Sequence, residues 1–331
     1  MTELSKSTDG TRNLHRTDLI DTALDNTALD NTALDNTALD NTMDKADKVS
    51  TVGIVGLGLI GGSLGLDLRS QGYRVIGASQ RASTCETAEA RGVVDRASPD
   101  LAILAEAEVI FLCTPLAHLE STTQRLIPYL NAETILTDVG SVKTPIVESI
   151  QALWKNFVGG HPMAGTAESG INAAIPNLFA GNPYVFTPTP ETPTRVITVV
   201  SAIAQDLGAI LYRATPEAHD RAVAWISHSP VIISASLIAA CLEEPDTEVL
   251  QLAQNLASSG FRDTSRVGGG NPELGLLMAQ LNRSNVLQSL HAYRQQLDHV
   301  IQHIQQENWE TLELILRKTQ AERPKFLRES T

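Results

Sequence analysis

The sequence predicts an α/β protein in which a doubly wound parallel-sheet domain is followed by an all-helical domain. Three observations lead to this fold class. The stretch from Thr51 to Arg81 reads as strand, glycine turn, helix and strand. Short apolar runs then alternate with helical stretches as far as Arg213, whereas after Thr215 long segments follow a helical period. Because alternating strands and helices build a parallel sheet with helices on both faces, the change of pattern predicts two domains.

A glycine-rich turn organises the first domain. Gly56, Gly58 and Gly61 are spaced as GxGxxG between an apolar strand and an amphipathic helix, with Leu59 and Ile60 in the same turn. The first glycine permits the tight turn, the second lets the backbone approach a pyrophosphate, and the third lets the helix pack closely on the strand. The phosphates would lie over the positive end of the helix. The pattern predicts a Rossmann-type dinucleotide-binding unit.

The end of the second predicted strand indicates which dinucleotide binds. NAD-binding forms place an acidic residue there, about 20 residues after the glycines, to bind the ribose hydroxyls. Here the segment offers Ser79, Gln80, Arg81 and Ser83, and a helix capped by that second serine is expected as far as Arg91. The serines can donate hydrogen bonds, and the guanidinium can pair with a 2′-phosphate. The segment predicts NADP as the cofactor; the alternative is that Arg81 is an ordinary solvated charge.

The composition excludes several classes of protein. The 331 residues are 42% hydrophobic, enough for a large core, and the formal net charge of −13 disfavours a nucleic-acid partner. Cys85, Cys113 and Cys241 are an odd, widely spaced set, and no ligand cluster has metal spacing. The longest apolar run, around Pro230 to Leu242, is too short for a membrane span, and the N-terminus lacks signal or transit character. We expect a cytoplasmic protein with no metal, nucleic-acid or membrane partner.

Residues 1–50 differ in kind from the rest of the chain. The unit TALDN occurs four times between Thr22 and Asn41. A period of five matches neither a helix face nor a strand face, and one leucine per unit buries too little to offset chain entropy. Four units without caps are also too few for a repeat solenoid. We expect a disordered, dispensable extension; the alternative is an interaction tag.

The remaining chain divides into a dinucleotide-binding domain (51–214) and a helical domain (215–331) that would bind substrate and dimerise. The helical domain carries an apolar face wider than one small domain needs: Leu276, Leu277, Met278, Leu281, Val286, Leu287, Leu290 and Leu297. This face favours a homodimer, although an ordinary helix-bundle core predicts much the same pattern.

Four polar clusters are candidates for the chemistry. They are Thr114-Pro115, the segment 138–143 (DVGSVK), the segment 159–165 (GGHPMAG) and the segment 260–266 (GFRDTSR), with His228 added from the helical half. Ligands of open α/β sheets bind at the carboxyl ends of the strands, where the first three clusters are expected. A short strand from Phe157 to Gly160 would deliver His161 into a glycine-rich loop. Asp138 and Lys143 are assigned no catalytic role.

Together these segments resemble the prephenate/arogenate dehydrogenase family. The motifs GLGLIGGS, GSVK, GGHPMAG, SHSP and GFRDTSR occur in the family's order and spacing, from about Val52 to the C-terminal helices. The resemblance implies oxidation of a ring hydroxyl in a cyclohexadienyl amino or keto acid by hydride transfer, with loss of the ring carboxylate as carbon dioxide. The product would be tyrosine from arogenate or 4-hydroxyphenylpyruvate from prephenate.

The resemblance also implies roles for single residues. His161 would be the catalytic hydrogen-bond acceptor, and a neutral histidine suits removal of a hydroxyl proton near physiological pH. Ser141 would orient it or bridge to the substrate hydroxyl. Arg262 can clamp a substrate carboxylate bidentately, or else form only a salt bridge with Asp263. His228 would either contact substrate or line the pocket. Thr114 and Pro115 would touch the nicotinamide side of the cofactor.

The substrate and two other classes stay open at this point. The NADP preference resembles the arogenate-using branch of the family, so arogenate is expected, with prephenate as the alternative. A β-hydroxyacid dehydrogenase or imine reductase would want a catalytic lysine in Pro216 to Leu242, which has none. A non-catalytic NADP-sensing module would predict decay of the polar site, whereas His161, Ser141 and Arg262 all stand in place.

Overall fold

The computed structural model describes residues 49–166 and 168–327. The predicted disordered extension therefore lies outside the described residues except for its last two. Val49 is buried in the hydrophobic core, and the backbone N–H of Ser50 donates to the Glu108 carboxylate at 2.8 Å. Val49 and Ser50 thus pack with the first domain.

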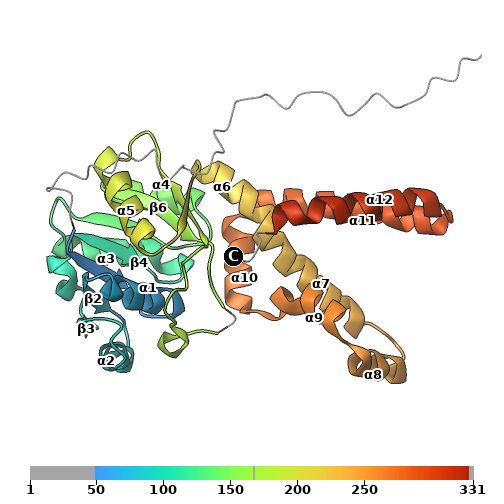
Figure 1. The fold of residues 1–331 in the computed structure, drawn as a ribbon, viewed down its shortest axis with the longest axis horizontal. Coiled ribbons are helices and arrows are strands. Elements are labelled where there is room, and N and C mark those ends of the chain that lie inside the picture. Colours follow the sequence, from blue (N-terminus) through green and yellow to red (C-terminus); the bar gives the residue numbers. More distant parts are fainter. Residues whose placement is uncertain (1–48, 167, 328–331) are drawn as a thin grey trace, which may run out of the picture. The chain divides into compact units, whose positions relative to one another are not determined.

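The described residues of the first domain form one eight-stranded sheet with helices on both faces, as the sequence predicts (Figure 1). Its order is β3-β2-β1-β4-β5-β6-β7-β8, and neighbouring strands are parallel except for the antiparallel pair β6–β7. The strands are β1 (Thr51–Val55), β2 (Arg74–Ala78), β3 (Arg96–Ser98), β4 (Val109–Leu112), β5 (Ile135–Asp138), β6 (Phe157–Pro162), β7 (Pro183–Thr187) and β8 (Ile210–Arg213).

Helices α1 and α5 cover one face of the sheet, and α3 and α4 cover the other. The elements between the strands are α1 (Leu59–Ser70), α2 (Ala82–Ala90), η2 (Leu101–Glu106), η3 (Leu116–His118), α3 (Leu119–Leu126), η4 (Ile127–Tyr129), α4 (Thr144–Leu153), η5 (Ile171–Ala173) and α5 (Thr194–Asp206). The expected serine cap of α2 is wrong: the helix already begins at Ala82, so Arg81 is the N-cap residue and Ser83 lies inside the first turn.

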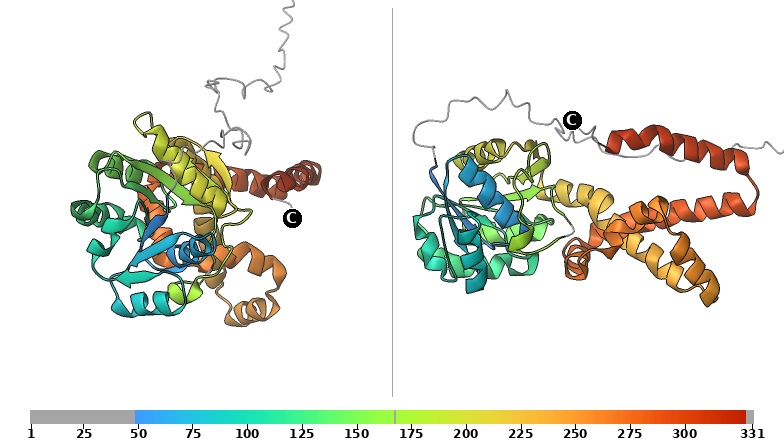
Figure 2. Two further views of the ribbon diagram at one scale, coloured as in Figure 1. Left: turned by 60° about the vertical axis from the view of Figure 1, so that its left-hand side comes forward. Right: turned by 60° about the horizontal axis from the view of Figure 1, so that its bottom comes forward.

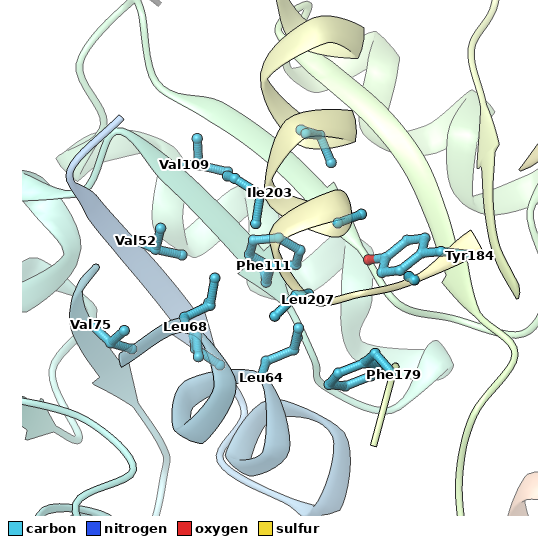
Figure 3. Close-up of a cluster of buried hydrophobic side chains, with 14 of the residues drawn as sticks. Val52, Leu64, Leu68, Val75, Val109, Phe111, Phe179, Tyr184, Ile203 and Leu207 are labelled. Atoms are coloured by element: carbon cyan, nitrogen blue, oxygen red, sulfur yellow. The ribbon is translucent and has the colours of Figure 1, made fainter. Parts of the chain in front are cut away.

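The side chains of the central strands alternate between two cores. In β1, Val52 and Ile54 join the core under α1 and α5, whereas Val55 joins the core under α3 and α4. Figure 3 shows the first of these cores, where Phe111 of β4 lies among Leu64, Leu68, Ile203 and Leu207. Each such side chain contributes about 1.5–3 kcal/mol when it is fully buried. Both faces are therefore covered, and the strand ends are left to bind ligands.

The second part of the described chain contains helices but no strand after β8. Its elements are α6 (Pro216–Val223), η6 (Ala224–His228), α7 (Ser229–Leu242), α8 (Thr247–Leu256), α9 (Ser259–Ser265), η7 (Arg266–Gly269), α10 (Pro272–Leu281), α11 (Arg283–Gln305), α12 (Trp309–Glu322) and η8 (Arg323–Phe326). Helix α12 folds back along α11 (Figures 1 and 2). The predicted all-helical domain is confirmed.

One turn of π-helix, η6, interrupts the run from α6 to α7. The N–H of Ser229 bonds to the carbonyl of Ala224, five residues earlier. Pro230 follows directly and has no N–H to continue a regular α-helical ladder, which gives a physical reason for the wider turn. The wider turn changes the phase of the helix, and the His228 side chain at its end is buried.

The continuous helical run Pro216–Leu242 is long and apolar enough to cross a membrane by length and composition alone. Its mean hydropathy is 1.6, and only a small share of its apolar stretch is buried within the chain. The run is longer than the apolar segment considered in the sequence, since α6 and η6 extend it toward the N-terminus. The same run also buries His219, Asp220 and His228, which is unlike a lipid-facing helix.

A buried ion pair ties β5 to β6. The Lys143 ammonium group pairs with the Asp138 carboxylate and also donates to the Gly160 carbonyl at 2.6 Å; both charged side chains are fully buried. The second carboxylate oxygen accepts the Gly160 N–H at 3.2 Å. Burial lowers the pKa of Lys143, while the charges of Asp138 and Asp220 act in the opposite direction. The pair fixes the backbone that carries His161.

Replacing Lys143 by methionine is expected to reduce the free energy of unfolding by about 3–5 kcal/mol, because it leaves Asp138 buried without its counter-ion. Urea unfolding at pH 7.5 measures the change. Arg96→Met is the control, since it removes a largely exposed ion pair with Glu106 and should cost less than about 1 kcal/mol. Similar losses in the two variants would contradict the structural role of the buried pair.

Candidate active site

The glycine turn between β1 and α1 is shaped for a phosphate group. Gly56 has φ +99°, and a Cβ there would lie 2.6 Å from the Cys113 carbonyl oxygen; a Cβ on Gly61 would lie 2.0 Å from the Gly56 carbonyl oxygen. A Cβ on Gly58 would meet nothing within 4 Å. The first and third glycines are thus required by the packing of the chain itself, whereas the second borders open space. A pyrophosphate fits there, at a helix N-terminus with no acidic residue in its first turn.

The other predicted cofactor contacts lie at the same edge of the sheet. Leu59 and Ile60 open α1 and are half-buried against the core. Thr114 and Pro115 follow β4, which pairs with β1 directly beside the glycine turn. The Thr114 hydroxyl oxygen is buried and has no hydrogen-bond partner among the described residues. These positions fit a nicotinamide dinucleotide that lies across the ends of β1 and β4.

The segment after β2 carries the predicted NADP contacts. Ser79 is half-buried, whereas Gln80, Arg81 and Ser83 are exposed. The Arg81 guanidinium forms no ion pair or hydrogen bond with any described residue. It is therefore available to an anionic group at the end of β2.

His161 lies within β6 rather than in a loop after it. The strand continues to Pro162 because β6 pairs antiparallel with β7, placing His161 opposite Val185. The expected glycine-rich loop at this position is therefore wrong, since two neighbouring strands hold the backbone here. The imidazole is buried and its direction is fixed by the strand.

One residue of α6, His219, meets His161, and the next, Asp220, meets His219. The Nδ1 atom of His161 lies 2.8 Å from Nε2 of His219, and the rings meet edge to face with centroids 5.0 Å apart. The Nδ1 atom of His219 lies 2.9 Å from the Asp220 carboxylate. That carboxylate also accepts the backbone N–H groups of Lys143 at 2.7 Å and Thr144 at 2.8 Å. A chain of hydrogen bonds therefore links His161 to the start of α4.

A second histidine reaches the site from η6. The Nδ1 atom of His228 lies 3.1 Å from the side-chain nitrogen of Asn282, which also donates to the Asp220 carbonyl at 2.7 Å. Its Nε2 atom is buried and has no hydrogen-bond partner among the described residues, although the nearby Ser141 backbone favours the charged ring. The structure thus brings His161, Ser141 and His228 into one neighbourhood.

The electrostatics keep the histidines neutral. Burial lowers the pKa of His161 well below its usual value, and His219, Lys143 and His228 add to this shift. Burial also lowers the pKa of His219, against the effect of Asp220, and lowers the pKa of His228 to about 4. Burial would raise the pKa of Asp220, but its hydrogen bonds from His219 and the backbone lower it overall. At neutral pH the site holds neutral imidazoles beside a carboxylate.

Unsatisfied polar atoms mark where a ligand would bind. The hydroxyl oxygens of Ser141 and Thr114 and the Nε2 atom of His228 are buried without a hydrogen-bond partner among the described residues. Buried polar groups in folded proteins are nearly always paired, so such a group calls for a ligand or water. These atoms are suited to a hydroxyl, carboxylate or carboxamide group.

Arg262 lies apart from this cluster in its contacts. It stands on α9, and its guanidinium pairs with Asp263 at 3.1 Å, with the two side chains 73% and 70% exposed. No hydrogen bond or ion pair in the described part of the chain joins Arg262 to the three histidines. The salt bridge considered as the alternative role is present, and the substrate clamp stays a prediction.

Sequence reasoning missed His219, Asp220 and Asn282. None of them lies in a motif that we singled out, and each side chain acts through a partner distant in sequence. A faint signal was available: adjacent polar residues in the first turns of an otherwise apolar helical run that begins at Pro216. Only the folded chain shows which groups they face.

The fold and the site together define the class of protein. A dinucleotide-binding sheet, an open glycine turn after β1 and a buried neutral imidazole at the end of β6 are the parts that a nicotinamide-dependent dehydrogenase needs. Hydride transfer requires the cofactor, and the accompanying proton requires a base.

Comparisons with known proteins identify the particular family. The family model described as prephenate dehydrogenase, nucleotide-binding domain matches residues 64–213, and that described as prephenate dehydrogenase, dimerization domain matches residues 215–318. Prephenate dehydrogenase from Bacillus subtilis is 30% identical over 272 residues, covering 79% of this chain and 72% of the relative. The chain belongs to the prephenate dehydrogenase family.

Two solved structures resemble the whole described chain. The crystal structure of Synechocystis arogenate dehydrogenase is 52% identical, with a TM-score of 0.76, and the match covers 84% of this chain and 100% of that one. Prephenate dehydrogenase from Aquifex aeolicus, solved with hydroxyphenyl propionate and NAD+, is 27% identical with a TM-score of 0.80, covering 85% and 99%. These relatives are oxidoreductases, and this chain shares their fold and family.

The two glycine positions should respond differently to alanine. Gly58→Ala is expected to leave the stability unchanged but to weaken dinucleotide binding about 10-fold or more, because the methyl group enters the space meant for the pyrophosphate. Gly61→Ala should instead destabilise the fold by about 1–3 kcal/mol through its contact with the Gly56 carbonyl. Calorimetric titration and urea unfolding measure the two effects, and unchanged affinity in the first variant would exclude this turn as the phosphate site.

Proposed function

We propose that this chain converts arogenate to tyrosine by oxidative decarboxylation with NADP+ as hydride acceptor. The observation that carries the proposal is the buried, neutral His161 at the end of β6, in a sheet whose first strand ends in an open glycine turn. The Ser141 hydroxyl, which follows β5, is buried without a hydrogen-bond partner among the described residues. The 52% identity to an arogenate dehydrogenase supports arogenate as substrate. Prephenate is the second candidate, favoured by the names of the curated relatives.

The residues of this chain would divide the chemistry as follows. A bound nicotinamide cofactor would supply the acceptor for the hydride that leaves the carbinol carbon. His161 takes the hydroxyl proton, while Ser141 holds the hydroxyl or the ring of His161 in place. The ring carboxylate then leaves as carbon dioxide, and its bonding electrons make the ring aromatic and push the carbonyl electron pair onto oxygen. The proton held by His161 returns to this phenolate oxygen, which gives the phenol of tyrosine and the neutral imidazole. Because aromaticity drives the loss of carbon dioxide, the site needs no separate group to cleave the carbon–carbon bond.

Reduction of NADP+ or NAD+ in the presence of arogenate or prephenate tests the proposal in four mixtures. Turnover is expected with arogenate and NADP+, and preferential turnover of prephenate with NAD+ would overturn both choices. His161→Asn should lower kcat by about 100-fold or more, the contribution typical of a general base. A folded protein that binds NADP+ but turns over none of the mixtures would favour the sensing-module alternative.

The decrease of kcat/KM in acidic solution should occur at an unusually low pH. A base works only when it is unprotonated, and the pKa of His161 is well below 6.5. The value of kcat/KM is therefore expected to stay constant from about pH 6.5 to 8 and to fall only in more acidic solution, when His161 takes up a proton. A decrease of kcat/KM near neutral pH that is absent in His161→Asn would contradict the lowered pKa of His161.

NADP is proposed over NAD because of Arg81. Its exposed guanidinium has no partner among the described residues, and no acidic residue stands between Ala78 and Cys85 at the end of β2. Arg81→Ala is expected to raise the Kd for NADP+ about 10- to 100-fold through loss of a charge-assisted hydrogen bond, with little change for NAD+. Arg125→Ala on α3 is the matched control, and equal effects on both cofactors would refute the assignment.

We also propose a homodimer formed through the helical domain. This domain exposes many large apolar side chains, among them Leu297, Ile301 and Ile304 along α11, and the matching family model is described as a dimerization domain. A partner chain, rather than lipid, would cover the apolar surface of the run Pro216–Leu242. Sedimentation at micromolar concentration should show a dimer, and Leu297→Asp combined with Ile301→Asp should shift it toward monomer. A monomeric wild-type protein would contradict this assignment.

A cytoplasmic location is proposed as well. Cys85, Cys113 and Cys241 are free thiols in the described chain, as expected of a reducing compartment.

A further inference from the structure

We propose that Asp220 and His219 are positioning residues that hold the proton of neutral His161 on Nδ1, so that Nε2 is the atom that accepts the substrate proton. The inference rests on the proposed function and deepens it by naming the reacting nitrogen and the residues that select it. A neutral imidazole carries its proton on one nitrogen only, and the hydrogen bond at the other end decides which.

The selection starts at Asp220. Its carboxylate accepts the N–H groups of Lys143 and Thr144, at 2.7 and 2.8 Å, so it is placed to be ionised and can only accept. The Nδ1 atom of His219, 2.9 Å away, must therefore be the donor in their hydrogen bond. These backbone donors lie at the start of α4, so the carboxylate cannot turn away from the imidazole without losing them.

The position of the proton on His161 follows from the position of the proton on His219. Since His219 is neutral and protonated on Nδ1, its Nε2 atom carries a lone pair and can only accept. The atom 2.8 Å from it is Nδ1 of His161, which must donate. His161 is also neutral, so its Nε2 atom is left with a lone pair. Through two successive hydrogen bonds, the ionised carboxylate of Asp220 thus makes Nε2 of His161 a hydrogen-bond acceptor.

The same chain supports the reaction step. As the carbinol carbon loses its hydride, the hydroxyl O–H bond breaks and a bond from hydrogen to Nε2 of His161 forms, which makes the ring a cation. Lys143 and His228 face this ring and disfavour its charge. Asp220 does not contact His161 itself but accepts from His219, whose other nitrogen meets His161.

The hydrogen bonds of His228 place its proton on the other nitrogen, Nε2, so that its tautomer is opposite to that of His161. The Asp220 carbonyl only accepts, so the Asn282 atom 2.7 Å from it is the amide nitrogen. The same nitrogen lies 3.1 Å from Nδ1 of His228 and donates to it, while the Asn282 oxygen accepts from Asn285 at 2.8 Å. The unpaired Nε2 atom of neutral His228 is then a donor. The site offers one acceptor and one donor imidazole, which suits a substrate that carries both a hydroxyl and carboxylates.

Two substitutions of His219 separate the roles of its nitrogens. The amide of asparagine takes the place of Nδ1, so His219→Asn keeps the donor to Asp220 but loses the acceptor for His161. The longer side chain of glutamine reaches the place of Nε2, so His219→Gln keeps that acceptor. We expect kcat to fall about 100-fold in His219→Asn, with KM for arogenate within about threefold of wild type, and to fall less than about 10-fold in His219→Gln.

The protonation state can be read directly in the wild-type dimer. Nitrogen-15 NMR of the histidine-labelled protein, with His161→Asn used to assign the signal, should show His161 protonated on Nδ1 at pH 7.5. This measurement needs no substrate, so it decides the inference even if the assay for the proposed reaction fails. A proton on Nε2, or equal kcat values in folded His219→Asn and His219→Gln, would overturn the proposal.

Discussion

The buried carboxylate of Asp220 is the interaction on which the rest of the site depends. It belongs to the first helix of the helical part, yet it accepts backbone N–H groups of Lys143 and Thr144 at the start of α4 and the imidazole of His219. Its own carbonyl accepts Asn282, at the start of α11. One residue thus connects the start of α4 to two helices of the second domain, and His219 connects it to His161.

Burying charged groups between the sheet and the helices costs free energy unless every charge has a partner. Burying an isolated carboxylate or ammonium group costs several kcal/mol, so the structure supplies Asp220 with three N–H donors and gives Lys143 to Asp138. The histidines avoid the cost by remaining neutral. Among the described residues, the buried polar atoms without a partner include the Ser141 hydroxyl and Nε2 of His228, which a substrate would meet in the proposed function.

The fold could be predicted well because its signals are local. A turn that needs positive φ at Gly56 and close packing at Gly61 can be recognised in six residues, and strands buried on both faces appear as short apolar runs. The strand at His161 was misjudged because its last residues, glycine, histidine and proline, read as a loop. Their extended geometry comes from antiparallel pairing with β7, a contact to residues more than twenty positions away.

By itself, the sequence determined the class of fold, the glycine turn and the absence of an acid after β2, since each depends on residue type and short spacing. The resemblance to a known family singled out His161 as the candidate base. Only the tertiary structure decided which groups surround that base. His219 and Asp220 follow His161 by 58 and 59 positions, and no propensity or period connects them. The reason is physical: the pKa and tautomer of an imidazole are set by burial and by the atoms within hydrogen-bonding distance, and these exist only once sheet and helices have packed together.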